Sequence, residues 1–149
     1  IPMDEIMKRA HEMYPALSAL QGFMEGAALY IETHPGESMA VSTGYLLFKS
    51  GRKITKLENG LNFSEAAAKH MVNPGRFVPI QTLISAIKYG EKYVDPQGSD
   101  AMMYYTVMYK NGEPYNLEVL YHEKTNTIFH FMYTRDSIGP LPKISKPRR

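Results

Sequence analysis

The chain has no cysteine among its 149 residues, which excludes a disulfide framework and a thiolate metal site. Its five histidines are scattered, and no two have the helical spacing of an HExxH motif, so we expect neither a bound metal nor another cofactor. No apolar run approaches the roughly 18 residues that cross a bilayer, and the N-terminus lacks the layout of a signal peptide. We therefore expect a soluble domain with no membrane-spanning segment.

The length of the chain fits one domain, or one domain with a small appendage, and allows a sizeable core. A formal net charge of +2 permits a nucleic-acid partner without indicating one. Four cations lie in residues 143–149, and we interpret this end as a solvated tail rather than an arm that binds nucleic acid. The first residue is Ile1, which favours a fragment of a longer polypeptide, although processing of the chain would give the same start.

Helical patterns fill the N-terminal part of the sequence. Residues 2–14 combine two acids in the first turn with an apolar stripe, and Pro15 should end or kink this helix. A second helical pattern covers residues 16–33, so the two form a helical hairpin or one bent helix. Residues 38–49 fit either a buried strand or a helix, and we favour the helix.

A polar connection with the dipeptide Asn59-Gly60 marks a turn and the most plausible division of the chain. We expect a helical N-terminal segment over residues 1–60, which is either a delivery part or an extension of the fold that follows. Residues 61–149 then form the main domain.

Two further helices are expected at the start of this domain. A short helix covers residues 65–71, and either Asn62 or Ser64 can cap it. A second helix begins at Pro79, runs to Tyr89 with one apolar face, and stops at Gly90.

The stretch from residue 102 to residue 135 predicts three strands joined by tight turns. They cover Met102–Lys110, Glu113–His122 and Asn126–Arg135, all rich in aromatic and β-branched residues. Asn111-Gly112 favours a type I′ hairpin between the first two strands. The fold class is therefore α+β, with N-terminal helices followed by an antiparallel β-meander that packs on the helix after Pro79.

The turns set the register of this meander. The two-residue turn places Tyr105 opposite Glu118. A three-residue second turn, residues 123–125, would place Glu118 opposite His130 and separate a core face from a polar face. Asn126 takes a left-handed turn position more easily than the residue before it, and would then shift this pairing. The core face of the predicted register holds Leu117, Val119, Phe129 and Phe131.

Several polar residues have the chemistry needed to cleave RNA without a metal. That reaction needs a base for the ribose 2′-hydroxyl, an acid for the leaving 5′-oxygen, and a cation or donor for the phosphate. Histidine suits the first two roles because its reference pKa is about 6.5, and tyrosine can stack on a base or donate to phosphate. The candidates are His70, Arg76, Tyr105, Glu118, His130 and Tyr133.

Each candidate also has a structural interpretation. His130 fits a hydrogen-bonded histidine within a sheet, and Glu118 fits an exposed strand residue paired with a lysine. His70 near a helix C-terminus suits the helix dipole, and Arg76 in the extended stretch before Pro79 can act as a structural clamp. The residue types alone therefore leave both interpretations open.

The ordered pattern H…GR.VP…AI..G…DP.G…LEVLY…TNTI.HF.Y resembles C-terminal toxin domains of bacterial polymorphic toxins, including those of contact-dependent inhibition. Those domains are similar to the barnase, EndoU, colicin and RelE (BECR) superfamily of ribonucleases. The resemblance covers about half of the chain, from residue 69 to residue 135. It implies helices followed by an antiparallel sheet, and metal-independent cleavage of RNA, with tRNA as the expected substrate, to a 2′,3′-cyclic phosphate.

The resemblance also implies partners and site residues. A cognate immunity protein would bind the toxin, a monomer delivered from the cell surface or by secretion within a larger effector to act in the target-cell cytoplasm. His70 and Arg76 match the H…GR segment, Glu118 matches the LEVLY glutamate, and His130 and Tyr133 match the last strand. These five are the implied catalytic set, with His130 as base or acid, Glu118 or His70 as its complement, and Arg76 on the phosphate.

The candidate substrate-binding residues are Tyr105, His122 and Thr127, of which Thr127 matches the last strand of the family pattern and Tyr105 comes from the predicted pairing with Glu118. His122 departs from the family, which commonly has an acidic or amide residue there, so it is either an added site group or a neutral surface change. A non-enzymatic α+β interaction domain, such as an immunity protein or a phage module, is the alternative function. A nuclease acting on DNA is less favoured because no acidic metal-binding cluster is evident in the sequence.

Overall fold

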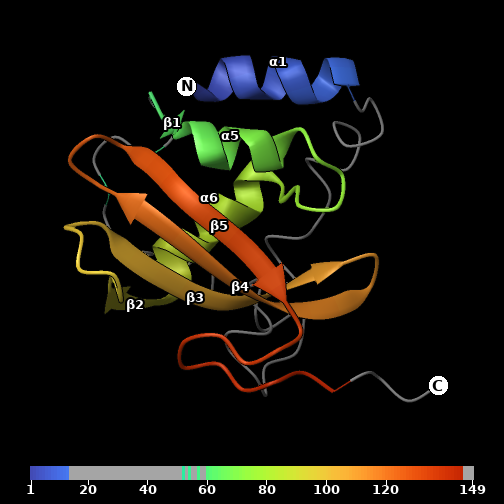
Figure 1. Cartoon of the computed structure of the whole chain (residues 1–149), viewed down its shortest axis with the longest axis vertical. Helices are drawn as coiled ribbons and strands as arrows, with labels where there is room; N and C mark the ends of the chain where they lie inside the picture. Colours follow the sequence, from blue (N-terminus) through green and yellow to red (C-terminus); the bar gives the residue numbers. More distant parts are fainter. Residues whose placement is uncertain (14–51, 53, 55–56, 58–59, 146–149) are drawn as a thin grey trace.

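The computed structural model describes residues 1–13, 52, 54, 57 and 60–145. They form an α+β fold in which helices pack on a five-stranded sheet (Figure 1). The helices expected over residues 16–33 and 38–49 lie outside the described residues, and the division of the chain at residue 60 stays a prediction. In chain order the elements are α1 (Met3–Met13), β1 (Asn62–Phe63), α5 (Glu65–Met71), α6 (Ile80–Tyr89), β2 (Glu91–Val94), β3 (Met102–Lys110), β4 (Glu113–His122) and β5 (Thr127–Thr134).

Helices α1, α5 and α6 confirm three of the expected helices. Ser64, and not Asn62, caps α5, because its hydroxyl oxygen accepts the Ala67 amide at 3.2 Å. The same hydroxyl donates to the Phe129 carbonyl oxygen at 2.7 Å. The cap therefore also fixes the start of α5 against strand β5.

Helix α6 starts one residue later than expected. Pro79 occupies the cap position, and the helix ends before Gly90, whose amide donates to the Ala86 carbonyl at 2.8 Å. The apolar stripe of α6 is almost completely buried, and each such side chain contributes roughly 1.5–3 kcal/mol to folding. The stripe consists of Ile80, Leu83, Ile84 and Ile87.

The strand order of the sheet is β1-β5-β4-β3-β2. Strands β2 to β5 pair antiparallel, which confirms the predicted meander, and β1 pairs parallel with β5, which makes the sheet mixed. The sequence did not predict β1 or β2. β1 has only two residues, and all four residues of β2 are exposed, so neither strand shows the alternation that predicts a half-buried strand.

The hairpin between β3 and β4 has the predicted register. Tyr105 pairs with Glu118, and Asn111 and Gly112 have φ values of 53° and 77°. Positive φ at both central residues is the requirement of a type I′ turn.

The predicted register between β4 and β5 is wrong. Glu118 pairs with Met132, and His130 pairs with Leu120. Asn126 takes the left-handed conformation, with φ of 49°, so the turn is one residue longer than the three-residue turn that we expected.

A bulge follows in β5. Tyr121 pairs with Ile128 and Leu120 with His130, so Phe129 is an extra residue between them. The longer turn and the bulge each shift the pairing by one residue, and the total shift of two leaves His130 on the face of Glu118. The prediction that Phe129 lies on the core face is wrong. Phe129 is half-buried, and its ring stacks on His122 at a centroid distance of 5.2 Å.

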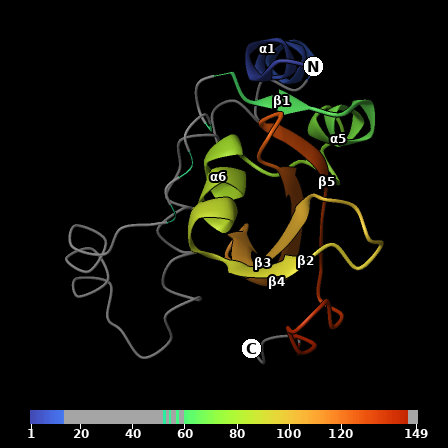
Figure 2. The ribbon, with the colours of Figure 1, turned by 90° about the vertical axis from the view of Figure 1, so that its left-hand side faces the viewer.

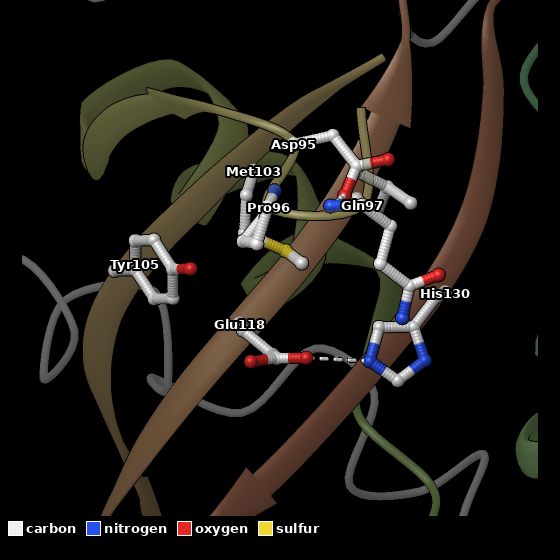
Figure 3. A pocket seen from close by; sticks show the side chains of 8 residues that line it. Asp95, Pro96, Gln97, Met103, Tyr105, Glu118 and His130 are labelled. Atoms are coloured by element: carbon white, nitrogen blue, oxygen red, sulfur yellow. Dashed lines mark hydrogen bonds and ion pairs between the residues drawn. The ribbon is translucent and has the colours of Figure 1, made fainter. Parts of the chain in front are cut away.

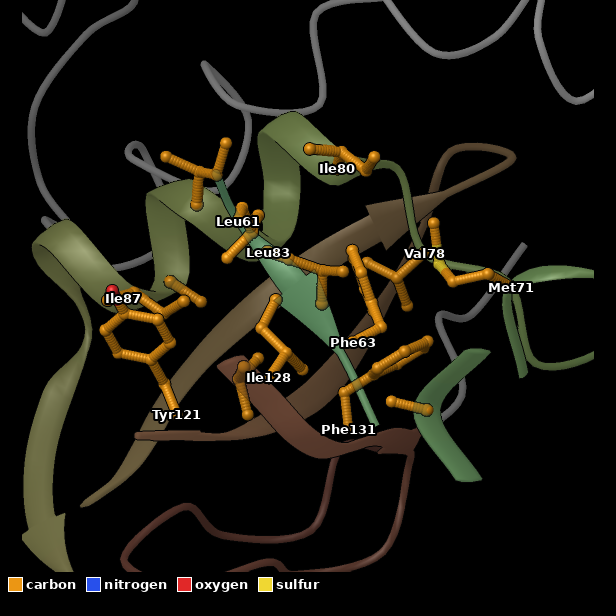
Figure 4. Packing of buried hydrophobic residues seen from close by; sticks show 14 of the residues in the cluster. Leu61, Phe63, Met71, Val78, Ile80, Leu83, Ile87, Tyr121, Ile128 and Phe131 are labelled. Carbon is orange, nitrogen blue, oxygen red and sulfur yellow. The ribbon is translucent and has the colours of Figure 1, made fainter. Parts of the chain in front are cut away.

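The main core lies between the sheet and the helices. Figure 2 shows α6 against one face of the sheet, with α1 and α5 at one end of it. Helix α1 contributes Ile6 to this core, and the Ile1 amino group donates to the Phe63 carbonyl at 2.6 Å. Residues 1–13 therefore pack with the domain that follows. The large side chains labelled in Figure 4 are Leu61, Phe63, Met71, Val78, Ile80, Leu83, Ile87, Tyr121, Ile128 and Phe131.

The opposite face of the sheet is only partly open. Met103, Tyr105 and Ile138 form a second, smaller cluster there. The segment after β5 covers this part of the face, and Tyr105 is 4% exposed. The face that the predicted register separated from the core is therefore partly covered, and Tyr105 is buried there.

Candidate active site

A pocket of about 330 Å³ lies on the face of the sheet opposite α6. Strands β3, β4 and β5 form its floor, and the loop after β2 forms one wall (Figure 3). The lining residues are Asp95, Pro96, Gln97, Met103, Tyr105, Glu118, Leu120 and His130.

Glu118 and His130 make the central contact of this pocket. The distance between Glu118 Oε2 and His130 Nε2 is 2.6 Å (Figure 3). The imidazole N–H donates and the carboxylate accepts, an arrangement that is strongest when the histidine is protonated. The Glu118 side chain is 15% exposed and that of His130 is 36% exposed, so a molecule in the pocket can reach both.

Asp95 is a second carboxylate in the pocket. It belongs to the Asp95-Pro96-Gln97-Gly98 turn, and its oxygens accept the amides of Gln97 at 2.9 Å and Ser99 at 3.2 Å. The Ser99 side chain, followed by the Gln97 amide, lowers the pKa of Asp95. This stretch is the DP.G part of the pattern that carries the resemblance, but the sequence did not identify it as a site wall, because only folding brings it beside β4 and β5.

Tyr105 lies deeper in the same pocket. Its ring contacts Tyr93 edge-on at a centroid distance of 5.7 Å. Burial raises the pKa of the Tyr105 hydroxyl, and the charges of Glu118 and Asp95 raise it further. The hydroxyl therefore stays protonated at neutral pH and can donate a hydrogen bond.

His70 and Arg76 do not line this pocket. Arg76 Nη2 lies 3.3 Å from His70 Nε2, and the His70 ring packs edge-on against Phe131, whose side chain is in the main core. Burial lowers the pKa of His70, and the positive charges of Arg76 and His130 lower it further. The structure therefore pairs His70 with Arg76 but separates both from the contact between Glu118 and His130.

Tyr133 also lies outside the pocket. It pairs with Leu117 in the sheet, so its side chain points to the face opposite that of His130. The Tyr133 hydroxyl donates to the Gly75 carbonyl at 2.8 Å and accepts from Lys110 Nζ at 2.6 Å. These contacts give Tyr133 a structural role.

His122 and Thr127 lie near the turn between β4 and β5. His122 Nε2 is 3.0 Å from Asp100 Oδ1, and His122 Nδ1 is 2.7 Å from Thr125 Oγ1. The Thr127 hydroxyl donates to the Thr125 carbonyl at 2.9 Å. Neither residue lines the pocket, and His122 instead joins the turn to the loop that carries Asp95.

Within the part of the chain that the structure describes, no group of three or more histidine, cysteine or acidic side chains could hold a metal ion. None of the described helices is long and apolar enough to cross a membrane. No family model matches the sequence, and comparisons with curated proteins and with solved structures find no match.

Proposed function

We propose that this domain is a metal-independent ribonuclease, and that it serves as the toxin part of a larger antibacterial effector. The observation that supports this most directly is the 2.6 Å contact between Glu118 and His130 in an open pocket. A carboxylate and an imidazole in one pocket can supply both the base and the acid that the reaction needs. The sequence resemblance to BECR-type toxin domains supplies the substrate class, RNA, with tRNA as the expected target.

In the proposed reaction Glu118 accepts the proton of the ribose 2′-hydroxyl as its oxygen attacks phosphorus. The protonated imidazole of His130 donates its proton to the 5′-oxygen as the bond from phosphorus to that oxygen breaks. The products are a 2′,3′-cyclic phosphate and a free 5′-hydroxyl. Tyr105 donates a hydrogen bond to a phosphate oxygen, a role that fits its protonated hydroxyl in the pocket.

Incubation of the purified chain with total tRNA in EDTA tests this proposal. The expected products are fragments that end in a cyclic phosphate. The variants Glu118→Gln and His130→Ala should each reduce the rate of cleavage by about 10²-fold or more, since each removes a group that transfers a proton. Glu123→Gln is the matched control, because Glu123 is exposed in the turn after β4 and outside the pocket.

A non-enzymatic interaction domain remains the alternative function, with the same face as a partner surface. Intact tRNA, together with normal growth of cells that express the chain, would contradict the ribonuclease. For an enzyme, the two pocket variants should lose toxicity but still bind a cognate immunity protein. For an interaction domain, the same variants should lose the partner.

A further inference from the structure

Among the residues that the structure describes, two cations beside strand β5 have no acidic partner. In the described ranges, neither Arg76 nor Lys110 has a carboxylate within ion-pair distance. The contact of the Arg76 guanidinium is instead with His70, at 3.3 Å. No carboxylate of the described residues therefore neutralises the positive charge at this place. The ion pairs of these ranges are Arg9–Glu5, His122–Asp100, His130–Glu118 and Arg135–Glu113.

The turn that carries Arg76 is held in place from several sides. Within the turn, the Arg76 amide donates to the Asn73 carbonyl at 2.9 Å. From the end of β3, Lys110 Nζ donates to the Pro74 carbonyl at 2.9 Å and to the Tyr133 hydroxyl. The hydroxyl of Tyr133 in turn donates to the Gly75 carbonyl. These bonds fix Lys110 and the backbone at Arg76 beside the same turn, while the Arg76 side chain is exposed to solvent.

The electrostatics of His70 agree with a site that attracts anions. The pKa of His70 is lowered by burial first, and then by the charges of Arg76 and His130. Burial itself favours no ion of either sign, but the positive charges of Arg76 and His130 would favour a bound anion here.

The position of these groups relative to the pocket follows from the alternation of β5. His130 faces the pocket, whereas the next residue, Phe131, faces the core side and contacts the His70 ring. His70 and Arg76 therefore lie across strand β5 from the contact between Glu118 and His130. An extended polyanion that reaches the pocket can cross the strand to them.

We infer that Arg76, His70 and Lys110 form a second anion site, which binds a backbone phosphate of the RNA that flanks the phosphate being cleaved. This inference rests on the proposed function for the identity of the ligand. It makes Arg76 a binding residue for a neighbouring nucleotide and not a stabiliser of the reacting phosphate. Phosphate contacts of this kind supply affinity and position without reading sequence.

Binding can be measured separately from cleavage with a short single-stranded DNA oligonucleotide, which lacks the 2′-hydroxyl and stays intact. The variant Arg76→Gln should weaken its binding and reduce the slope of log K against log salt by about one. Arg76→Lys should keep most of the binding, because it keeps the charge. Lys92→Gln is the matched control, since Lys92 is exposed on β2, away from α5.

Two further measurements distinguish binding of a flanking phosphate by Arg76 from stabilisation of the reacting phosphate. In NMR titrations, the oligonucleotide should raise the pKa of His70 in the wild type but not in Arg76→Gln. In tRNA cleavage, Arg76→Gln should raise KM while kcat stays within about twofold, the sign of lost uniform binding. If kcat falls by about 10²-fold at unchanged KM, or oligonucleotide binding is unaffected, the inference is overturned. If the wild type cuts no RNA but still binds the oligonucleotide through Arg76, the anion site stands and the ribonuclease proposal fails.

Discussion

The Glu118 carboxylate lies 2.6 Å from the His130 imidazole, although the two residues are not paired in the sheet. Glu118 pairs with Met132 and His130 with Leu120, so the side chains meet diagonally across two strands. The bulge at Phe129 makes this possible. Without the bulge, the register set by the four-residue turn would continue along β5, and His130 would pair with Val119. The His130 side chain would then point toward the core.

If Glu118 and His130 act as one unit, the losses of activity caused by substituting each of them should not be additive in free energy. Glu118→Gln and His130→Asn should each reduce tRNA cleavage by about 10²-fold or more, and the double variant should be little worse than either single variant. Single-turnover cleavage rates of the four proteins give this comparison. Rates that multiply, so that the double variant falls by the product of the two effects, would show that the residues act independently.

Asn126 should be important for the stability of the turn before β5. Asn126 is buried and has a φ of 49°. Its side chain accepts a hydrogen bond from the Tyr121 hydroxyl and donates one to the Leu57 carbonyl. Asn126→Ala loses these bonds, each worth about 1–3 kcal/mol when a buried partner is left unpaired, and adds backbone strain. Asn126→Gly loses the same bonds without the strain. In urea unfolding, the free energy of unfolding of Asn126→Ala should therefore be about 1 kcal/mol lower than that of Asn126→Gly. Equal stability of the two variants would contradict this assignment of strain.

Gly139 should control the shape of the pocket through Tyr105. Gly139 has a φ of 51°, and a Cβ added to it would lie 2.3 Å from two carbons of the Tyr105 ring. Gly139→Ala should therefore destabilise the fold and displace Tyr105. Gly98→Ala is the control, because Gly98 also has a positive φ, 86°, but no atom lies within 4 Å of its added Cβ. Thermal unfolding should show a larger loss for the Gly139 variant, and equal losses would mean that only the backbone conformation matters.

Two aspartates should make the fold sensitive to acid. Hydrogen bonds from Ser99 and Gln97 lower the pKa of Asp95 from its ordinary 3.8, and the hydrogen bond with His122 is the main cause that lowers that of Asp100. A carboxyl group whose pKa is lowered by folding stabilises the fold at every pH above its pKa in the unfolded chain. This stability is lost as the pH falls through its pKa in the folded protein. The Tm should therefore fall steadily below about pH 4, and less steeply in Asp100→Asn. Parallel pH curves for the variant and the wild type would contradict the role of Asp100.

Sequence patterns predicted those parts of the fold that depend on neighbours along the chain. A cap at Asn62 or Ser64 was predicted for α5, and Ser64 fills it. The stripe after Pro79 forms α6, and Asn111-Gly112 sets the first hairpin, because capping, helical periodicity and turn geometry are local. The α+β class and the meander followed from these signals. The placing of Glu118 and His130 on one face was also correct, although the predicted direct pairing was not.

The composition of the site was decided by long-range packing. Tyr133 carries the right chemistry but alternates to the other face, and His70 and Arg76 lie beside the core across β5. Asp95 and Gln97 enter the pocket because the loop after β2 folds over the sheet. By itself the sequence determined which residues can donate and accept protons. Only the tertiary structure decided which of them meet, because one bulge and the coverage of each face set distances that no local pattern encodes.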